Sequence, residues 1–262
     1  MPFAQLPGVR LHYRMDGDAG SPPLLLSNSL GTSLEMWEPQ IGVLEARFRV
    51  VRYDSRGHGR SEVTRGPYSI EMLAQDALGL LDALAIPRAH VCGLSMGGVV
   101  AMWLGVNAPA HVDHLVLANT AAKIGTAETW NARIDAVRTG GMASIAPAVL
   151  ARFFSPQLLE QPTPMIAQLR ATFEAASAEG YVASCAAVRD MDQRQSLHRI
   201  HVPTLVIAGA DDFVTPADEG RYVAERIRGA RYIELPAAHL SNIQAAPAFT
   251  QALVQFLTGR PE

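Results

Sequence analysis

Hydrophobic and polar positions alternate in the first segment of the chain. Val9, Leu11 and Tyr13 alternate with two arginines and a histidine, the last of which is Arg14 after Tyr13. A period of two is typical of a strand with one buried face, here near the edge of a sheet. The apolar runs that follow are short and continuous, and each leads into Gly, Asn or Asp, which indicates strands buried on both faces. These runs lie at residues 24–26, 50–53, 91–92, 115–117 and 205–207.

Segments with helical spacing separate these runs. Apolar residues recur every three or four positions over residues 70–84, behind Ser69 as an N-cap, and residues 99–107 predict a second helix. Further along, the pattern predicts a helix near residues 217–227, a strand over residues 231–235 and a last helix that Pro247 opens and Gly259 ends. Alternating strands and helices predict an α/β fold with a mostly parallel sheet.

The alternation pauses between about residues 122 and 197. Ala, Arg, Met and Gln dominate this block, β-branched runs disappear, and apolar residues recur at three and four positions. We therefore predict a discontinuous core, formed by residues 1–121 and 198–262, that carries residues 122–197 as an inserted helical cap.

Composition narrows the class of protein. The 262 residues are 48% hydrophobic and 18% charged, which is enough apolar material for a sizeable core. The net charge is −3 and no long run of Lys and Arg is present, so we expect no nucleic-acid partner. The sequence therefore favours a small-molecule role.

Two cysteines, Cys92 and Cys185, are too few for a disulfide framework and do not have zinc-ligand spacing. The first residues do not resemble a secretory signal, and the longest uncharged apolar stretch, residues 91–106, is shorter than the roughly 20 residues of a membrane span. We expect a cytoplasmic protein with no membrane association and no metal.

A Gly-x-Ser-x-Gly motif surrounds Ser95. Gly93 and Gly97 flank it after the strand that ends at Cys92, and a helix follows. This strand, turn and helix context is the one a nucleophile elbow needs, because the glycines leave room for a sharp turn that exposes the serine. Ser95 is the candidate nucleophile.

A serine hydroxyl needs a base, and in this architecture an acid and then a histidine follow the nucleophile along the chain. His239 is the histidine that satisfies this order, in the loop after the last predicted strand. Asp211 and Asp212 both follow the strand at residues 205–207. The frequent Gly-x-x-Asp-x-x-x-Pro pattern of such hydrolases selects Asp212, and Asp211 stays as the alternative. The oxyanion hole requires two backbone N–H donors, for which we predict Met96 and Leu30.

These motifs, in this order, identify the chain as similar to α/β-hydrolases. Three segments more specifically resemble 3-oxoadipate enol-lactonases of aromatic catabolism: residues 27–32 (Ser-Asn-Ser-Leu-Gly-Thr), residues 119–125 (Asn-Thr-Ala-Ala-Lys-Ile-Gly) and residues 238–242 (Ala-His-Leu-Ser-Asn). Many relatives have His-Gly where Asn28 and Ser29 stand. The resemblance implies hydrolysis of a small anionic enol-lactone to 3-oxoadipate, with water as co-substrate and no cofactor.

Other readings remain open. A carboxylesterase, a carbon–carbon bond hydrolase or a perhydrolase would use the same three residues, and a lactone receptor on this fold would bind without turnover. Arg56 and His58 are interpreted as parts of a structural turn and Cys92 as core packing. The sequence does not predict an oligomeric state.

The carboxylate of such a lactone needs a cation or several donors. Trp130 and Arg133 are three positions apart near the start of the cap and share a helical face, so we predict that they bind the substrate. Arg152 and Lys123 are the alternatives.

Overall fold

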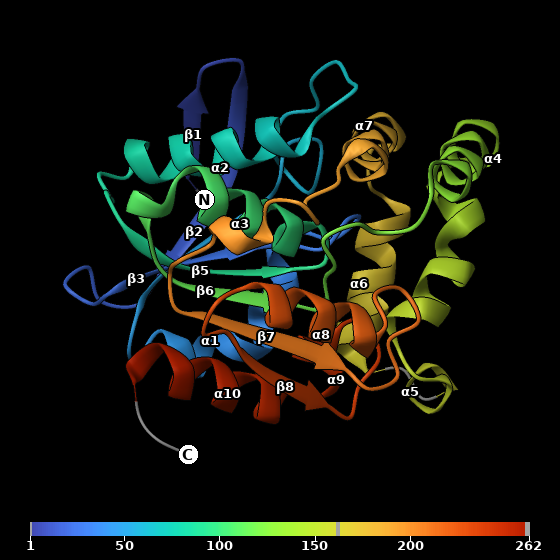
Figure 1. The fold of residues 1–262 in the computed structure, drawn as a ribbon. Coiled ribbons are helices and arrows are strands. Elements are labelled where there is room, and N and C mark those ends of the chain that lie inside the picture. The colour runs from blue at the N-terminus through green and yellow to red at the C-terminus, as the bar shows by residue number, and fades with distance from the viewer. Residues whose placement is uncertain (1, 161–162, 260–262) are drawn as a thin grey trace.

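The centre of the protein is one mixed sheet, shown in Figure 1. The computed structural model describes residues 2–160 and 163–259, and within them eight strands pair in the order β1-β2-β4-β3-β5-β6-β7-β8. β1 and β2 are antiparallel to each other, β2 is antiparallel to β4, and the other pairs are parallel. The strands are β1 (Phe3–Leu6), β2 (Val9–Asp16), β3 (Pro23–Ser27), β4 (Arg49–Tyr53), β5 (Ala89–Leu94), β6 (Val112–Ala118), β7 (Thr204–Gly209) and β8 (Arg231–Leu235).

Helices cover both faces of this sheet. In Figure 1, α2, α3 and α8 lie in front of the strands, whereas α1, which packs against α10, lies behind them. The α-helices outside the predicted cap are α1 (Glu38–Leu44), α2 (Ile70–Ala83), α3 (Met96–Asn107), α8 (Ala217–Arg226), α9 (Ser241–Gln244) and α10 (Ala246–Thr258). Short 3-10 turns occur at Leu34–Trp37, Pro109–His111 and Leu197–Arg199. A mostly parallel sheet between helices confirms the predicted α/β fold class.

Among the described residues, four α-helices lie between β6 and β7, the strands that flank the predicted cap. They are α4 (Ala127–Phe153), α5 (Pro156–Glu160), α6 (Pro164–Glu174) and α7 (Ala178–Asp190). Figure 1 shows them together beyond the carboxyl ends of β7 and β8. The helical path of α4 is interrupted at Gly141, whose φ of 72° favours glycine. We keep the division at residues 122 and 197 as a proposal, and residues 161–162 of the cap and 260–262 of the core lie outside the described residues.

Local sequence signals correctly predicted where several helices begin or end. The Ser69 side chain accepts a hydrogen bond from the Met72 backbone N–H, as an N-cap does at the start of α2. At the other end of the chain, Gly259 ends α10 in the left-handed conformation with φ 65°. The edge strand β1 was not predicted. Its four residues are too few to show a period.

The alternation in β2 gave the wrong face for one residue. It placed His12 with the outward-facing arginines, but His12 is fully buried and its Nδ1 lies 2.7 Å from Asp54 Oδ2. Tyr13, expected on the buried face, is only half-buried. Asp54 follows β4, the neighbouring strand, so the partner that makes His12 inward-facing is 42 residues away in sequence.

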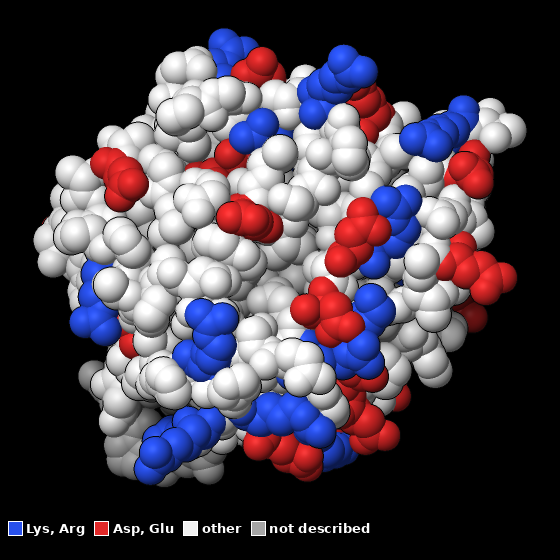
Figure 2. Space-filling view, turned by 45° about the horizontal axis from the view of Figure 1, so that its top comes forward, with Lys and Arg blue, Asp and Glu red and all other residues white. Residues whose placement is uncertain are grey.

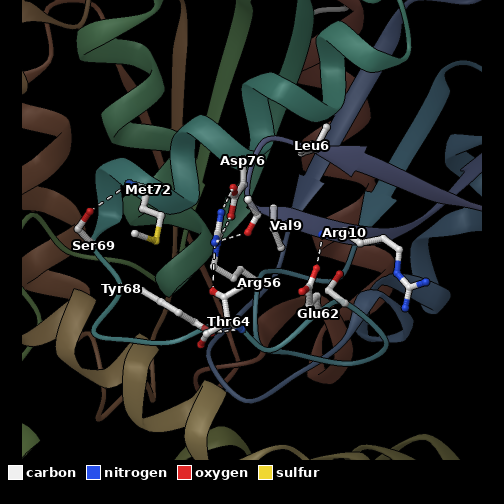
Figure 3. A network of polar contacts seen from close by, with 12 residues as sticks. Leu6, Val9, Arg10, Arg56, Glu62, Thr64, Tyr68, Ser69, Met72 and Asp76 are labelled. Carbon is white, nitrogen blue, oxygen red and sulfur yellow. Dashed lines mark hydrogen bonds and ion pairs between the residues drawn. The ribbon is translucent and has the colours of Figure 1, made fainter.

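Arg56 and His58 belong to the turn after β4, as the sequence analysis interpreted them. Figure 3 shows the Arg56 guanidinium pointing at the Asp76 carboxylate of α2. The two form paired hydrogen bonds, Nε to Oδ2 at 2.8 Å and Nη2 to Oδ1 at 2.6 Å. Both side chains are buried, and this bidentate pair ties the turn to α2.

The surface carries charges of both signs. On the face drawn in Figure 2, basic and acidic side chains of the described residues lie next to one another, with no continuous basic stripe. The absence of a nucleic-acid partner stays a prediction. Within residues 2–160 and 163–259, no helix combines the length and apolar character needed to cross a membrane.

Two histidines on adjacent strands predict an acid-sensitive stability. The rings of His90 and His114 pack edge to face with centroids 5.0 Å apart. Burial lowers the pKa of both imidazoles. The positive charges of His114 and Arg88 lower the pKa of His90 further. The unfolded chain, with His pKa near about 6.5, then binds more protons, so stability is present above that pH and is lost as the pH falls below it.

We expect His90→Phe to flatten this loss. One histidine contributes at most about 1.4 kcal/mol per pH unit to the slope of the unfolding free energy. Urea denaturation of the variant and the parent protein, measured between about pH 7 and pH 5, gives the two slopes. Equal slopes would show that the pKa of His90 is the same in the folded and unfolded states.

Candidate active site

Three loops at the carboxyl edge of the sheet bring Ser95, Asp212 and His239 together. Ser95 lies between β5 and α3, Asp212 follows β7, and His239 follows β8. His239 Nε2 is 2.8 Å from Ser95 Oγ, and His239 Nδ1 is 2.9 Å from Asp212 Oδ2. All three are at least 94% buried, with exposed fractions of 6%, 4% and 1%. This is the geometry of an activated serine: a base within reach of the hydroxyl and an acid that orients the base.

The turn at Ser95 has the strained backbone of a nucleophile elbow. Ser95 has φ 58° and ψ −116°, a region that non-glycine residues rarely adopt. Its N–H donates to Ala118 O at 3.0 Å and its carbonyl accepts from Thr120 Oγ1 at 2.8 Å, which holds the conformation from β6.

Close backbone contacts explain the two glycines of the motif. A Cβ on Gly93 would lie 2.0 Å from Gly97 O, and one on Gly97 would lie 2.1 Å from Ser27 O. Neither backbone atom can move aside without breaking the elbow. Both positions therefore require glycine, and the approach of Gly97 to Ser27 places the serine beside the loop after β3.

The carboxylate of Asp212 accepts five hydrogen bonds. Oδ2 accepts from His239 Nδ1, from Asn119 Nδ2 at 3.0 Å and from Thr215 Oγ1 at 2.8 Å. Oδ1 accepts from the backbone N–H groups of Val214 at 2.8 Å and Thr215 at 3.0 Å. Asp211, the alternative acid, is exposed, so the structure brings Asp212 and not Asp211 to the histidine.

These contacts determine the charge of Asp212. Burial alone would raise the pKa of this carboxyl, but the charge of His239 and the hydrogen bonds from His239, Asn119 and Thr215 outweigh burial, so its pKa lies below the usual range. Asp212 is therefore a carboxylate at neutral pH and favours a proton on Nδ1 of the histidine, which leaves Nε2 free to accept the serine proton.

Leu30 and Met96 lie beside Ser95 in the wall of one cavity. No acceptor among the described residues takes the backbone N–H of either residue. The loop that carries Leu30 is fixed by Asn28, whose carbonyl accepts from Gly97 N–H at 2.9 Å and whose Nδ2 donates to Tyr53 O at 2.7 Å. The oxyanion hole itself stays a prediction, and it is supported by two backbone N–H groups that lie beside the serine without an acceptor.

The cavity lies between the core loops and the cap. Trp130 and Arg133 of α4 both line it, and the Arg133 guanidinium carbon lies 4.8 Å from the Trp130 ring centroid. Arg152 lines it too. Lys123 does not, and its Nζ donates to Met191 O at 3.3 Å.

Sequence reasoning missed three residues that position the site. Phe153 of α4 stacks on the His239 ring with centroids 5.6 Å apart. Asn119 and Thr215 donate to Asp212. Asn119 has φ 44°, and it follows a buried strand at the sheet edge where ligands bind, a signal that could have found it. Phe153 had no such signal, because its contact depends on how the cap docks.

Cys92 is part of the core and not of the site. The side chain is fully buried, and burial raises the pKa of its thiol well above the usual range. A thiol held neutral in this way is a poor nucleophile. Among the residues that the structure describes, no group of three or more His, Cys, Asp or Glu side chains is arranged to hold a metal ion.

The fold and this arrangement define the class of protein. A family model described as the alpha/beta hydrolase fold matches residues 22–246. The chain therefore belongs to the α/β-hydrolase fold family.

Two relatives and one solved structure show which members of this family the chain is similar to. The chain is 42% identical to "3-oxoadipate enol-lactonase 2" of Acinetobacter baylyi, with 94% of this chain and 92% of the relative covered. It is 32% identical to a "Putative carbamate hydrolase RutD" of Variovorax paradoxus, with 94% and 96% covered. The crystal structure of the enol-lactonase from Burkholderia xenovorans LB400 superposes with a TM-score of 0.97 at 46% identity, covering 98% of this chain and all of that one.

Proposed function

We propose that this protein is a serine hydrolase that opens 3-oxoadipate enol-lactone to 3-oxoadipate in the catabolism of aromatic compounds. Full-length similarity to enol-lactonases supports the substrate, and the geometry of Ser95, Asp212 and His239 supports the reaction type. The chemistry needs only these side chains, two backbone donors and water, so the proposed enzyme uses no cofactor.

In the proposed first half-reaction, His239 Nε2 takes the proton from Ser95 Oγ as this oxygen attacks the lactone carbonyl carbon. The carbonyl oxygen becomes negatively charged and accepts hydrogen bonds from the N–H groups of Leu30 and Met96. Collapse of the tetrahedral intermediate breaks the bond to the ring oxygen, which leaves as an enolate. An enolate is a good leaving group, so it can depart before it is protonated. It then takes up the proton held by His239, which leaves the histidine neutral for the second half-reaction, and its conversion to the ketone makes ring opening hard to reverse.

In the second half-reaction, His239 accepts a proton from water, and the resulting hydroxide attacks the acyl carbon on Ser95. The ester bond breaks, Ser95 Oγ regains its proton from His239, and the free carboxylic acid leaves. Asp212 stays ionised throughout and stabilises the imidazolium in both halves.

The observation that carries the substrate proposal is the pair of arginines in the cavity wall. Arg133 and Arg152 both line the cavity that contains Ser95, and neither forms an ion pair with a carboxylate of the described residues. Arg133 is half-buried, whereas Arg152 is exposed. A half-buried guanidinium without an anionic partner favours an anionic ligand, because a carboxylate would neutralise it. We propose that Arg133, with Trp130 beside it, binds the carboxymethyl arm.

We expect Arg133→Met to raise KM for the anionic lactone by about tenfold or more, which corresponds to roughly 1.4 kcal/mol, and to leave hydrolysis of a neutral lactone nearly unchanged. Arg138→Met is the matched control, since Arg138 lies on the same helix but does not line this cavity. Steady-state kinetics on both lactones measure the split. Equal effects on the two substrates, or none on either, would reject Arg133 and turn the test to Arg152.

The function itself is tested by adding purified protein to the enol-lactone and following the loss of its ultraviolet absorbance. Rapid loss with formation of 3-oxoadipate supports the proposal. Turnover of simple esters, carbon–carbon ring-cleavage products or peracids in place of the lactone would reassign the substrate, and lactone binding without turnover would indicate a receptor. We also propose a cytoplasmic location, which cell fractionation tests.

A further inference from the structure

A second serine lies in the wall of the active-site cavity. Ser29 is on the loop after β3 and immediately precedes Leu30, one of the two expected backbone donors. We propose that the Ser29 hydroxyl is a third hydrogen-bond donor to the oxyanion. This assignment rests on the acyl-transfer step of the proposed function and not on the identity of the lactone.

The Ser29 side chain is buried and has no partner. The residue is 1% exposed, and its Oγ forms no hydrogen bond with any described residue. Buried hydroxyls are nearly always paired, because water that is lost on folding must be replaced by another partner. An unpaired hydroxyl in the wall of a reaction cavity therefore indicates a partner that arrives with the substrate.

The backbone of Ser29 is fixed on both sides. Its N–H donates to Met36 Sδ at 3.3 Å, and its carbonyl accepts from Thr32 N–H at 3.2 Å and from Thr32 Oγ1 at 2.8 Å. The preceding residue, Asn28, is held to the nucleophile elbow through Gly97 N–H. The hydroxyl is thus carried on a rigid loop, and only its own rotation is free. A donor held in this way is preorganised, so it costs little reorganisation when charge develops.

The chemistry of the transition state suits a hydroxyl donor. A lactone carbonyl oxygen is weakly negative, whereas the tetrahedral intermediate carries a full negative charge on the same atom. The Ser29 O–H can donate to that oxygen without transferring its proton, so no bond to hydrogen breaks. Because the hydrogen bond strengthens as the charge develops, it lowers the barrier more than it tightens substrate binding. Its loss is therefore expected in kcat and not in KM.

Another buried serine provides the matched control. Ser184 of α7 is fully buried, its Oγ also has no partner among the described residues, and it does not line the cavity. Ser29→Ala and Ser184→Ala thus remove the same group from the same kind of environment. Neither change breaks a side-chain hydrogen bond within the described protein, so both variants are expected to keep or slightly raise Tm.

The experiment compares the two variants in three assays: the enol-lactone, 4-nitrophenyl acetate and the rate of Ser95 labelling by a fluorophosphonate. We expect Ser29→Ala to lower kcat on both substrates and the labelling rate by about 10- to 100-fold, with KM little changed and Tm maintained. Ser184→Ala should leave all three unchanged. Ser29→Cys, which keeps the shape with a weaker donor, should give intermediate rates.

Two outcomes would overturn the assignment. Unchanged rates in all three assays would show that the hydroxyl does not reach the oxyanion. A rise in KM confined to the anionic lactone would show that Ser29 binds the carboxylate arm. Hydrolysis of 4-nitrophenyl acetate without hydrolysis of the lactone would contradict the proposed substrate. The ester and labelling assays would still decide the role of Ser29.

Discussion

Replacing Ser95 or His239 by alanine is expected to lower kcat by about 10⁴- to 10⁶-fold, and the double replacement should cost little more than either single one. The reason is the direct contact between the two side chains, since His239 Nε2 lies 2.8 Å from Ser95 Oγ. Without the histidine the hydroxyl has no base, and without the hydroxyl the base has no proton to accept. Steady-state kinetics of the three variants on the enol-lactone give the comparison.

Additive losses in the double variant would contradict a catalytic unit. Circular dichroism and Tm must accompany the kinetics, because His239 is buried against Phe153 and its removal also leaves a cavity. The Ser95→Ala variant is the cleaner of the two, since it removes one oxygen atom. A Ser95→Ala protein that folds normally and keeps its activity would reject the serine mechanism.

Much of the core was predictable because its signals are local. Ser69 begins α2, Gly259 ends α10, and the run of apolar residues around Val206 forms a strand buried on both faces. Each feature depends on residues that are neighbours in sequence. The order of Ser95 and His239 along the chain was informative for a related reason, since parallel strands align their carboxyl ends at one edge of the sheet.

Contacts between distant segments were not predictable in this way. His12 was expected to face outward, and it is buried because Asp54 approaches it from another strand. Phe153 stacks on His239 because α4 of the cap docks over the core loops. Neither contact leaves a periodic trace in the sequence. The sequence also could not decide between Arg133 and Arg152 as the residue that binds the substrate. Both line the cavity, and they differ in burial, which depends on how the cap packs on the core.

The sequence left open which of the two aspartates after β7, Asp211 or Asp212, orients His239. Replacing each of them by asparagine tests the choice. We expect Asp212→Asn to lower kcat by about 10⁴-fold, because an amide at this position favours the wrong tautomer of His239. Asp211→Asn should change kcat by no more than a few-fold, since that side chain is exposed and has no contact with the histidine. The two variants differ by one position and carry the same chemical change.

The hydrogen bonds of Asp212 show why asparagine cannot replace it. All five contacts are donors to the carboxylate, three at Oδ2 and two at Oδ1. An asparagine amide must direct its NH₂ group at one of these two sets, so donors face donors in either orientation. We therefore expect Asp212→Asn to lose stability as well as activity, whereas Asp211→Asn should keep both.

The stability lost in Asp212→Asn should depend on pH, whereas the loss from a simple packing defect would not. The pKa of the Asp212 carboxyl is lowered in the folded protein, so its contribution to stability is fully present above the unfolded value near about 4 and is lost as the pH falls through the folded value. The difference in Tm between the parent protein and Asp212→Asn should accordingly be constant near neutral pH and shrink in acid. A difference that stays the same down to low pH would show that the folded carboxyl has an ordinary pKa, and a larger kinetic effect of Asp211→Asn would transfer the orienting role to Asp211.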